Sequence, residues 1–244
     1  MTERRYEYAP AGTLPGLLQR GRGLGALMAA EDPAAAAGLV YGCLRWEWRW
    51  DRQADERALY LARLVRDLAL PLGPVAELPA GDARAWADEV LELPAGGPVR
   101  RDGHGDHGRG EDSRPLPVLL EELERCWVER TWCGPAALAR GLARFGPEAG
   151  GAASLLRRFW LWTPHSSERP AYLEALAAVA PAGLDEAYVE SLWDCESGAR
   201  LLGVRHAPER PEVGERLVAL RDDPLEETAV RDAAAVRLGG GGAG

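Results

Sequence analysis

Apolar residues recur along most of this chain at the spacing of an amphipathic helix. In DERALYLARLVRDLAL, four of them fall at positions i, i+3, i+4 and i+7: Leu61, Leu64, Val65 and Leu68. The acidic residues Asp55 and Glu56 lie just ahead, where the dipole of a helix favours negative charge. The pattern therefore predicts a helix with one buried face.

Similar segments, each closed by Gly or Pro, occupy residues 13–93 and continue from residue 116 to Leu238. The run from Gly21 to Gly25 contains three glycines, but it lacks the strand that precedes a nucleotide-binding loop, so we interpret it as a break between helices. No segment alternates apolar and polar residues with the period of a strand. The pattern predicts an all-α protein.

Two segments interrupt this pattern. Residues 96–115 are dense in Gly, Pro and charge, which favours a flexible linker because they can bury little apolar surface. The glycine-rich end should be disordered. We therefore predict N-terminal helical hairpins over residues 1–95, a disordered linker over 96–115, a C-terminal helical region over 116–238 and a glycine tail over 239–244.

An internal repeat suggests how the helices are arranged. Residues 142–147 (LARFGP) are echoed by residues 176–181 (LAAVAP), 34 residues later, and each copy lies between two apolar helical segments. Because a hairpin of two short helices cannot bury its apolar faces alone, such hairpins stack against one another. The repeat predicts an α-solenoid of stacked antiparallel hairpins.

This pattern resembles the HEAT-like repeat superfamily of armadillo-type α-solenoids, which includes the repeats of phycobilisome lyase-type proteins. The resemblance covers residues 116–239 and is clearest between Ala139 and Phe159, where LARFGPEAGGAASLLRRF has the order helix, Gly-Pro turn, helix. Between Arg221 and Gly239, RDDP resembles the turn, although extra residues follow Pro224. The resemblance implies a non-catalytic protein-interaction or scaffold module that binds another protein and needs no cofactor.

Composition narrows the possible functions. All 29 basic residues are Arg, so the chain has no lysine for a phosphate-binding loop, a Schiff base or kinase chemistry. The net charge of −9 is spread along the chain, which argues against a nucleic-acid or anionic membrane partner. The four dispersed cysteines, an N-terminus without a signal-like apolar run, and the lack of a membrane-length apolar stretch predict a cytoplasmic protein.

Tryptophan and arginine are concentrated in two segments. In RWEWRWD, Trp46, Trp48 and Trp50 alternate with charged residues that include Arg49, and RRFWLW contains Arg157, Arg158, Trp160 and Trp162. One interpretation is a binding surface, because Trp and Arg dominate interaction hot spots. The other is that the rings fill the core and rim of helical hairpins. A groove with Trp and Arg would also suit the HEAT-like DNA glycosylases that recognise alkylated bases, which the chain resembles in fold class only. Because a minority of the superfamily is catalytic, the resemblance leaves open an enzyme or lyase-like chaperone on the same scaffold, of alkylated-base DNA glycosylase or tetrapyrrole lyase type.

No catalytic or metal site can be assigned from motifs. His104, Asp106 and His107 lie in a Gly-rich stretch that would orient metal ligands poorly, and His165 is expected at a surface or cap. Cys126 and Cys133 would lie two turns apart in one continuous helix, too far for a disulfide. The carboxylates are expected on solvated faces, and neither GxSxG nor HExxH occurs. These observations favour a scaffold over an enzyme.

Overall fold

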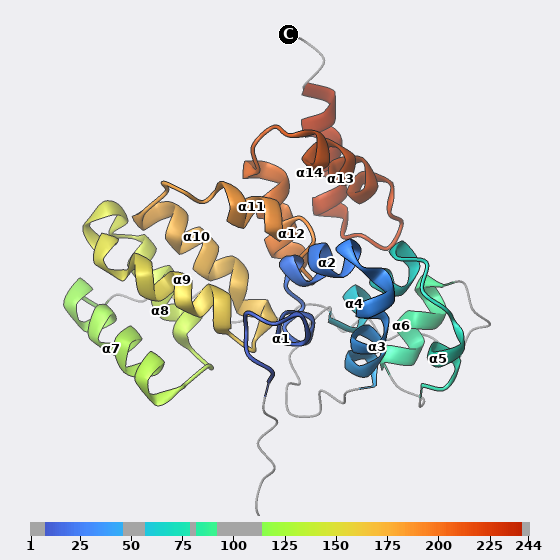
Figure 1. Cartoon of the computed structure of the whole chain (residues 1–244). Helices are drawn as coiled ribbons and strands as arrows, with labels where there is room; N and C mark the ends of the chain where they lie inside the picture. Colours follow the sequence, from blue (N-terminus) through green and yellow to red (C-terminus); the bar gives the residue numbers. More distant parts are fainter. Residues whose placement is uncertain (1–7, 46–56, 79–81, 92–113, 241–244) are drawn as a thin grey trace, which may run out of the picture.

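The computed structural model of the chain describes residues 8–45, 57–78, 82–91 and 114–240 (Figure 1). Within these ranges all regular secondary structure is helical, which confirms the predicted all-α class. The helices enclose three clusters of buried apolar side chains. The helices before residue 92 form most of one cluster, the helices between residues 116 and 184 form most of the second, and the last four helices form the third.

Six helices precede residue 92: α1 (Leu14–Gln19), α2 (Gly23–Glu31), α3 (Pro33–Leu44), α4 (Arg57–Asp67), α5 (Gly73–Ala76) and α6 (Asp82–Val90). Their ends follow from local chemistry. The side chains of Thr13 and Asp32 accept hydrogen bonds from the first-turn amides of α1 and α3, and a proline opens each helix. Gly21, with φ of 63°, ends the first helical segment, which confirms the predicted helix break.

The amphipathic pattern of α4 is also confirmed. Leu61, Leu64 and Val65 are buried, and Leu68 is half-buried against the same core. The side chains of α4 pack with α3 and α6, so this helix is the centre of the N-terminal core. Asp55 and Glu56, predicted to begin this helix, lie outside the described residues.

Eight α-helices and two 3-10 helices follow residue 113: α7 (Leu116–Glu129), α8 (Pro135–Ala143), η1 (Gly146–Ala152), α9 (Ala153–Trp162), η2 (Ser166–Glu168), α10 (Arg169–Val179), α11 (Asp185–Ser191), α12 (Ser197–His206), α13 (Pro211–Asp222) and α14 (Thr228–Gly240). Arg130 takes the left-handed conformation, with φ of 58°, and ends α7. Cys126 and Cys133 therefore do not share one continuous helix, because Cys133 lies in the loop before α8, and both are free thiols.

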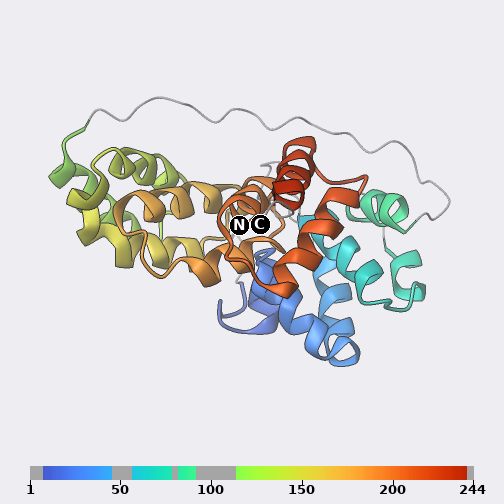
Figure 2. The same cartoon turned by 90° about the horizontal axis from the view of Figure 1, so that it is seen from above.

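Consecutive C-terminal helices pack mostly on their near neighbours in sequence. Helix α7 contacts α8, α8 contacts α10, α10 contacts α9 and α12, and α12 contacts α11 and α14. Figure 2 shows α7 at one end of an elongated molecule and α5 and α6 at the other. Helices α6 and α7 are consecutive among the described elements, yet they lie at opposite ends of the molecule.

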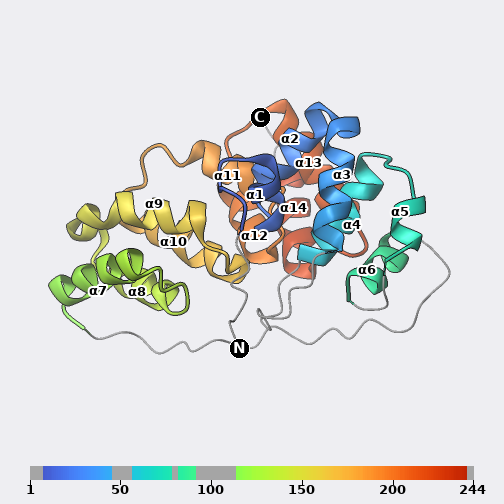
Figure 3. The ribbon, with the colours of Figure 1, turned by 60° about the horizontal axis from the view of Figure 1, so that its bottom comes forward.

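The N-terminal helices are placed against the middle of the C-terminal ones rather than beside α7. Figure 3 shows α1 and α2 next to α11 and α12, and α2 contacts α11 directly. Cys195, in the loop between α11 and α12, belongs to the same buried cluster as α3 and α4. The predicted linker lies almost wholly outside the described residues. Only its last two residues, Arg114 and Pro115, are described.

Candidate functional site

Two groups of side chains are candidates for function: a buried ionic junction between the two halves of the chain, and an exposed surface of tryptophan and arginine. At the centre of the junction, Arg169 of α10 forms two hydrogen bonds to the carboxylate of Asp194, of 2.9 and 2.8 Å. Its Nη2 also lies 3.2 Å from the Gly21 carbonyl oxygen and 3.2 Å from the Cys195 Sγ. Arg169 and Asp194 are both buried.

Burial by itself would lower the pKa of the Arg169 guanidinium, because the interior solvates a charge poorly. The nearby charge of Asp194 and its hydrogen bonds outweigh that effect and raise the pKa above its ordinary value. Arg169 is therefore charged and held by its carboxylate partner. By contrast, burial lowers the pKa of neighbouring Arg20 to about 10, since no carboxylate compensates it to the same extent.

Arginines of the N-terminal half bind the end of α9. Nε of Arg20 donates to the Trp162 carbonyl oxygen (3.2 Å), and Nη1 of Arg22 donates to the Leu161 carbonyl oxygen (3.1 Å). Arg57 Nη1 donates to the Pro164 carbonyl oxygen at 3.2 Å. The last carbonyls of a helix lack intrahelical partners, so Arg20 and Arg22 satisfy two of them and complement the helix dipole, while Arg57 binds the loop that follows α9.

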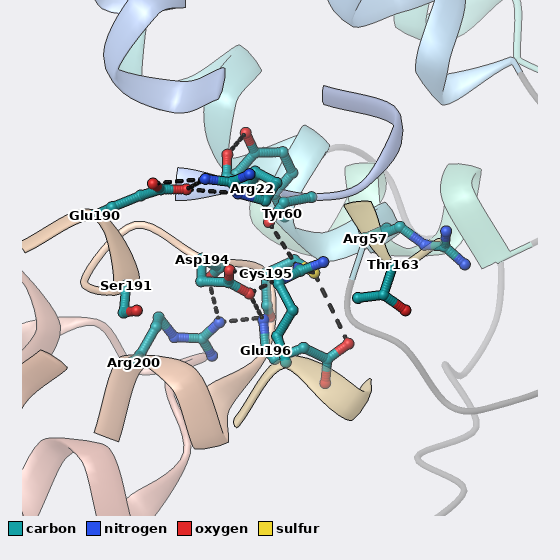
Figure 4. A network of polar contacts seen from close by, with 12 residues as sticks. Arg22, Arg57, Tyr60, Thr163, Glu190, Ser191, Asp194, Cys195, Glu196 and Arg200 are labelled. Carbon is teal, nitrogen blue, oxygen red and sulfur yellow. Dashed lines mark hydrogen bonds and ion pairs between the residues drawn. The ribbon is translucent and has the colours of Figure 1, made fainter. Parts of the chain in front are cut away.

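Further ion pairs extend the junction (Figure 4). Arg22 forms a bidentate pair with Glu190 of α11, with both distances 2.7 Å, while its guanidinium lies 4.5 Å from the Trp160 ring centroid. Arg200 pairs with Glu226 at 2.7 Å, and Arg63 of α4 lies 3.7 Å from the same carboxylate. Arg22 thus connects the start of α2 to α11, and Arg63 connects α4 to the loop before α14, in each case across more than a hundred residues.

The glycines of the Gly21–Gly25 run permit this close approach. A Cβ on Gly23 would lie 1.9 Å from the Glu190 carbonyl oxygen, and one on Gly21 would lie 2.3 Å from the Cys195 Sγ. The backbone amide of Cys195 donates to the Gly21 carbonyl oxygen at 2.9 Å. The run therefore does more than break a helix, because it lets two backbones touch.

Ion pairs such as Arg22–Glu190 and Arg63–Glu226 join the two halves and hold them in position against each other. The prediction that carboxylates lie on solvated faces is wrong here, since Asp194, Glu196 and Glu226 are buried. Sequence spacing contained no signal for these pairs, because the partners lie 25 to 168 residues apart.

The second group is centred on Trp127, near the end of α7. Its ring packs edge-on against three others, with centroid distances of 6.0 Å to Trp132, 5.4 Å to Phe159 and 6.3 Å to Trp162. The guanidinium groups of Arg130 and Arg158 lie 4.9 and 5.9 Å from the Trp127 ring centroid. We call Trp127, Trp132, Trp162, Arg130 and Arg158 the aromatic–arginine surface.

The tryptophans predicted in RRFWLW separate into two environments. Trp160 is buried, with 6% of its surface exposed, and faces the ionic junction, whereas Trp162 is 42% exposed. Arg157 and Arg158 are exposed, but only Arg158 contacts the ring cluster. Trp127, Trp132 and Arg130 were not predicted as site residues, although the run CWVERTW already concentrates them.

Four predicted binding residues, Trp46, Trp48, Arg49 and Trp50, lie outside the described residues, as do His104, Asp106 and His107. His165, expected at a surface or cap, is buried at the N-cap position of η2, and its Nε2 lies 3.6 Å from the Cys133 Sγ. The pair joins two loops 32 residues apart, a proximity that helical periodicity cannot reveal.

In the part of the chain that the structure describes, no group of three or more His, Cys, Asp or Glu residues is placed to hold a metal ion. None of the helices described is long and apolar enough to cross a bilayer. No family model, curated protein or solved structure matches this chain.

Proposed function

We propose that the chain is a non-catalytic protein-interaction module of HEAT-like type, and that its aromatic–arginine surface binds an acidic, partly apolar segment of a partner protein. The observation that carries the proposal is the cluster around Trp127, where an exposed Trp162 lies beside arginines that have no carboxylate partner among the residues that the structure describes. Tryptophan and arginine together are the residues most enriched at the energetic centres of interfaces.

The solenoid part of the proposal is supported by the packing of the C-terminal helices. Leu142 and Leu176, which occupy equivalent places in the two copies of the repeat, are both buried in the same core cluster. Their helices, α8 and α10, pack directly against each other. This is the relation that stacked repeats of one supersecondary unit are expected to have.

Charge indicates what the partner segment must contain. Arg130, Arg157 and Arg158 are exposed, and no described carboxylate lies within ion-pair distance of any of them. Helix α9 itself carries two arginines and no acidic residue, in a chain whose net charge is −9. Carboxylates of a partner would therefore find unpaired cations here, and bidentate Arg–carboxylate hydrogen bonds fix orientation as well as charge.

Apolar contacts would supply the rest of the binding energy. Trp162 exposes 42% of its surface and Val128, on the same α7 end as Trp127, exposes 79%. Apolar residues of this size gain about 25 cal/mol for each Å² removed from water. An acidic segment that also contains Leu, Phe or Trp would thus match both components of the surface.

The test is selection of ligands from a displayed library of random linear peptides on the full chain. We expect enriched peptides to combine Asp or Glu with large apolar residues. Their binding should weaken at least tenfold in Trp162→Ala and in Arg158→Glu, since each removes a central contact. Arg205→Glu, a matched charge reversal at an exposed position of α12, should leave binding unchanged. Equal binding by all three variants would contradict the proposal.

A further inference from the structure

Cys133 and His165 form a thiol–imidazole pair that the proposed interaction does not use. Cys133 lies in the loop between α7 and α8, and His165 lies in the loop between α9 and η2. The Cys133 Sγ is 3.6 Å from Nε2 of the imidazole, which is hydrogen-bond distance for sulfur. In the tautomer that leaves Nε2 unprotonated, the thiol donates to it and the imidazole can accept the proton.

The imidazole is held in place. His165 is 7% exposed, and its backbone amide donates to the Thr163 Oγ1 at 3.1 Å, so the residue is packed into its loop. Cys133, in contrast, is exposed to solvent. One partner is therefore a fixed base and the other is open to reagents.

The start of α8 adds a second electrostatic effect. Gly134, with φ of 109°, is the residue before the helix, and within the described part of the chain no side chain caps the helix amides there. Cys133 thus lies immediately before an uncapped helix N-terminus, whose partial positive charge stabilises a nearby anion. An adjacent imidazolium and a helix N-terminus are two of the environments that convert a cysteine into a reactive thiolate.

The other three cysteines differ from Cys133. Cys43 is buried, and burial raises the pKa of its thiol to about 12. Cys126 is half-buried, and burial likewise raises its pKa. Cys195 is buried in the ionic junction. Of the four thiols, only Cys133 is exposed.

We propose that Cys133, activated by His165, is a modification site that undergoes thiol–disulfide exchange with low-molecular-weight disulfides. The thiol proton passes to Nε2, and the thiolate attacks one sulfur of the disulfide. A new S–S bond forms as the old one breaks, and the departing thiolate takes the proton from the imidazolium. One disulfide and one thiol are consumed, and one mixed disulfide and one thiol are produced. The reaction itself needs no partner at the aromatic–arginine surface, which Cys133 adjoins because it directly follows Trp132.

The probe is glutathione disulfide, applied to the full chain and followed by mass spectrometry of the peptides that contain each cysteine. At neutral pH Cys133 should react on the order of tenfold faster than Cys126 in the same molecule. Its rate should reach half of its plateau at a lower pH than the rate of a free cysteine, whose thiol titrates at about pH 8.5. A Cys133 profile like that of a free cysteine would overturn the proposal.

His165→Gln should slow the reaction of Cys133 on the order of tenfold and move its profile toward that of a free cysteine, while the rate at Cys126 stays the same. Because His165 is buried, its replacement could disturb the local structure. A second measurement therefore uses only the wild-type chain. In urea sufficient to unfold the wild-type chain, Cys133 and Cys126 should react at similar rates. A preference for Cys133 that persists after unfolding would show that the folded pair is not its cause.

Discussion

Arginine is used in opposite ways in two regions of this protein. At the ionic junction, arginines such as Arg169 are buried and paired with carboxylates, whereas on the aromatic–arginine surface Arg130 and Arg158 are exposed and lie over a tryptophan ring. Helix α9 belongs to both regions, because its Trp160 faces the junction and its Trp162 faces solvent. A composition rich in Trp and Arg therefore does not by itself indicate binding; pairing and exposure decide the role.

The largest difference between buried and exposed ion pairs should appear when one charge is removed from the junction. Asp194→Asn leaves Arg169 buried without its counter-charge and should lower the free energy of unfolding by about 3–5 kcal/mol. Chemical denaturation would measure the loss. Asp222→Asn, which disrupts an exposed pair with Arg221 on α13, is the control and should leave the denaturation midpoint almost unchanged. Similar effects of the two variants would mean that burial does not distinguish these ion pairs.

Steric separation of the two halves should have the next largest effect. Gly23→Ala places a Cβ against the Glu190 carbonyl oxygen and should lower the free energy of unfolding by about 1–3 kcal/mol. Gly38→Ala is the matched control, because its Cβ meets open space in the middle of α3 and should stabilise the protein by about 0.5–1 kcal/mol. Thermal denaturation of both variants would test the contrast, and tolerance of Gly23→Ala would argue against close backbone contact.

Alkaline pH provides a weaker test of the same junction. Tyr60 is buried, its hydroxyl donates to the Arg22 carbonyl oxygen at 2.9 Å, and burial raises its pKa well above 10.0. The unfolded chain thus releases this proton first, so the stability that Tyr60 contributes is complete below about pH 10 and is lost as the pH rises further.

The wild type should therefore lose up to about 1.4 kcal/mol of stability per pH unit above pH 10 through this one group. Tyr60→Phe should show a shallower alkaline decline in urea denaturation measured across that range, although its stability at neutral pH falls by about 1 kcal/mol with the lost hydrogen bond. An unchanged alkaline slope would exclude this role for Tyr60.

The smallest stability change is expected on the aromatic–arginine surface. Trp162→Ala removes an exposed ring and one edge-on contact with Trp127, so the free energy of unfolding should fall by only about 1 kcal/mol. Circular dichroism during thermal denaturation would measure it. A loss as large as that of Asp194→Asn would identify Trp162 as a core residue and remove it from the binding proposal.

Much of the secondary structure could be predicted from the sequence because it depends on neighbouring residues. The buried face of α4 and the break at Gly21 follow from helical spacing and from the conformational freedom of glycine. Residues two apart on a helix face roughly opposite sides, so the spacing of Trp160 and Trp162 in RRFWLW places the two rings in different environments. Which of the two is buried depends on the N-terminal half.

The candidate sites depend on contacts that a single sequence does not encode locally. Arg22 and Glu190 are 168 residues apart, and Cys133 and His165 are 32 residues apart. No periodicity connects such pairs, and each partner alone resembles an ordinary surface residue. Arg22 and Glu190 meet because α2 packs on α11. Cys133 and His165 meet because the loop before α8 lies against the loop after α9.

The position of Cys195 has a consequence for how the protein is made. This residue completes the apolar core of α3 and α4, yet it is translated long after them. Until the loop that contains Cys195 has been synthesised, part of the apolar surface of α3 and α4 therefore remains exposed to water. Closure of this core depends on a loop that is synthesised more than a hundred residues after α4, and such long-range closure is slow and leaves a nascent chain open to chaperones.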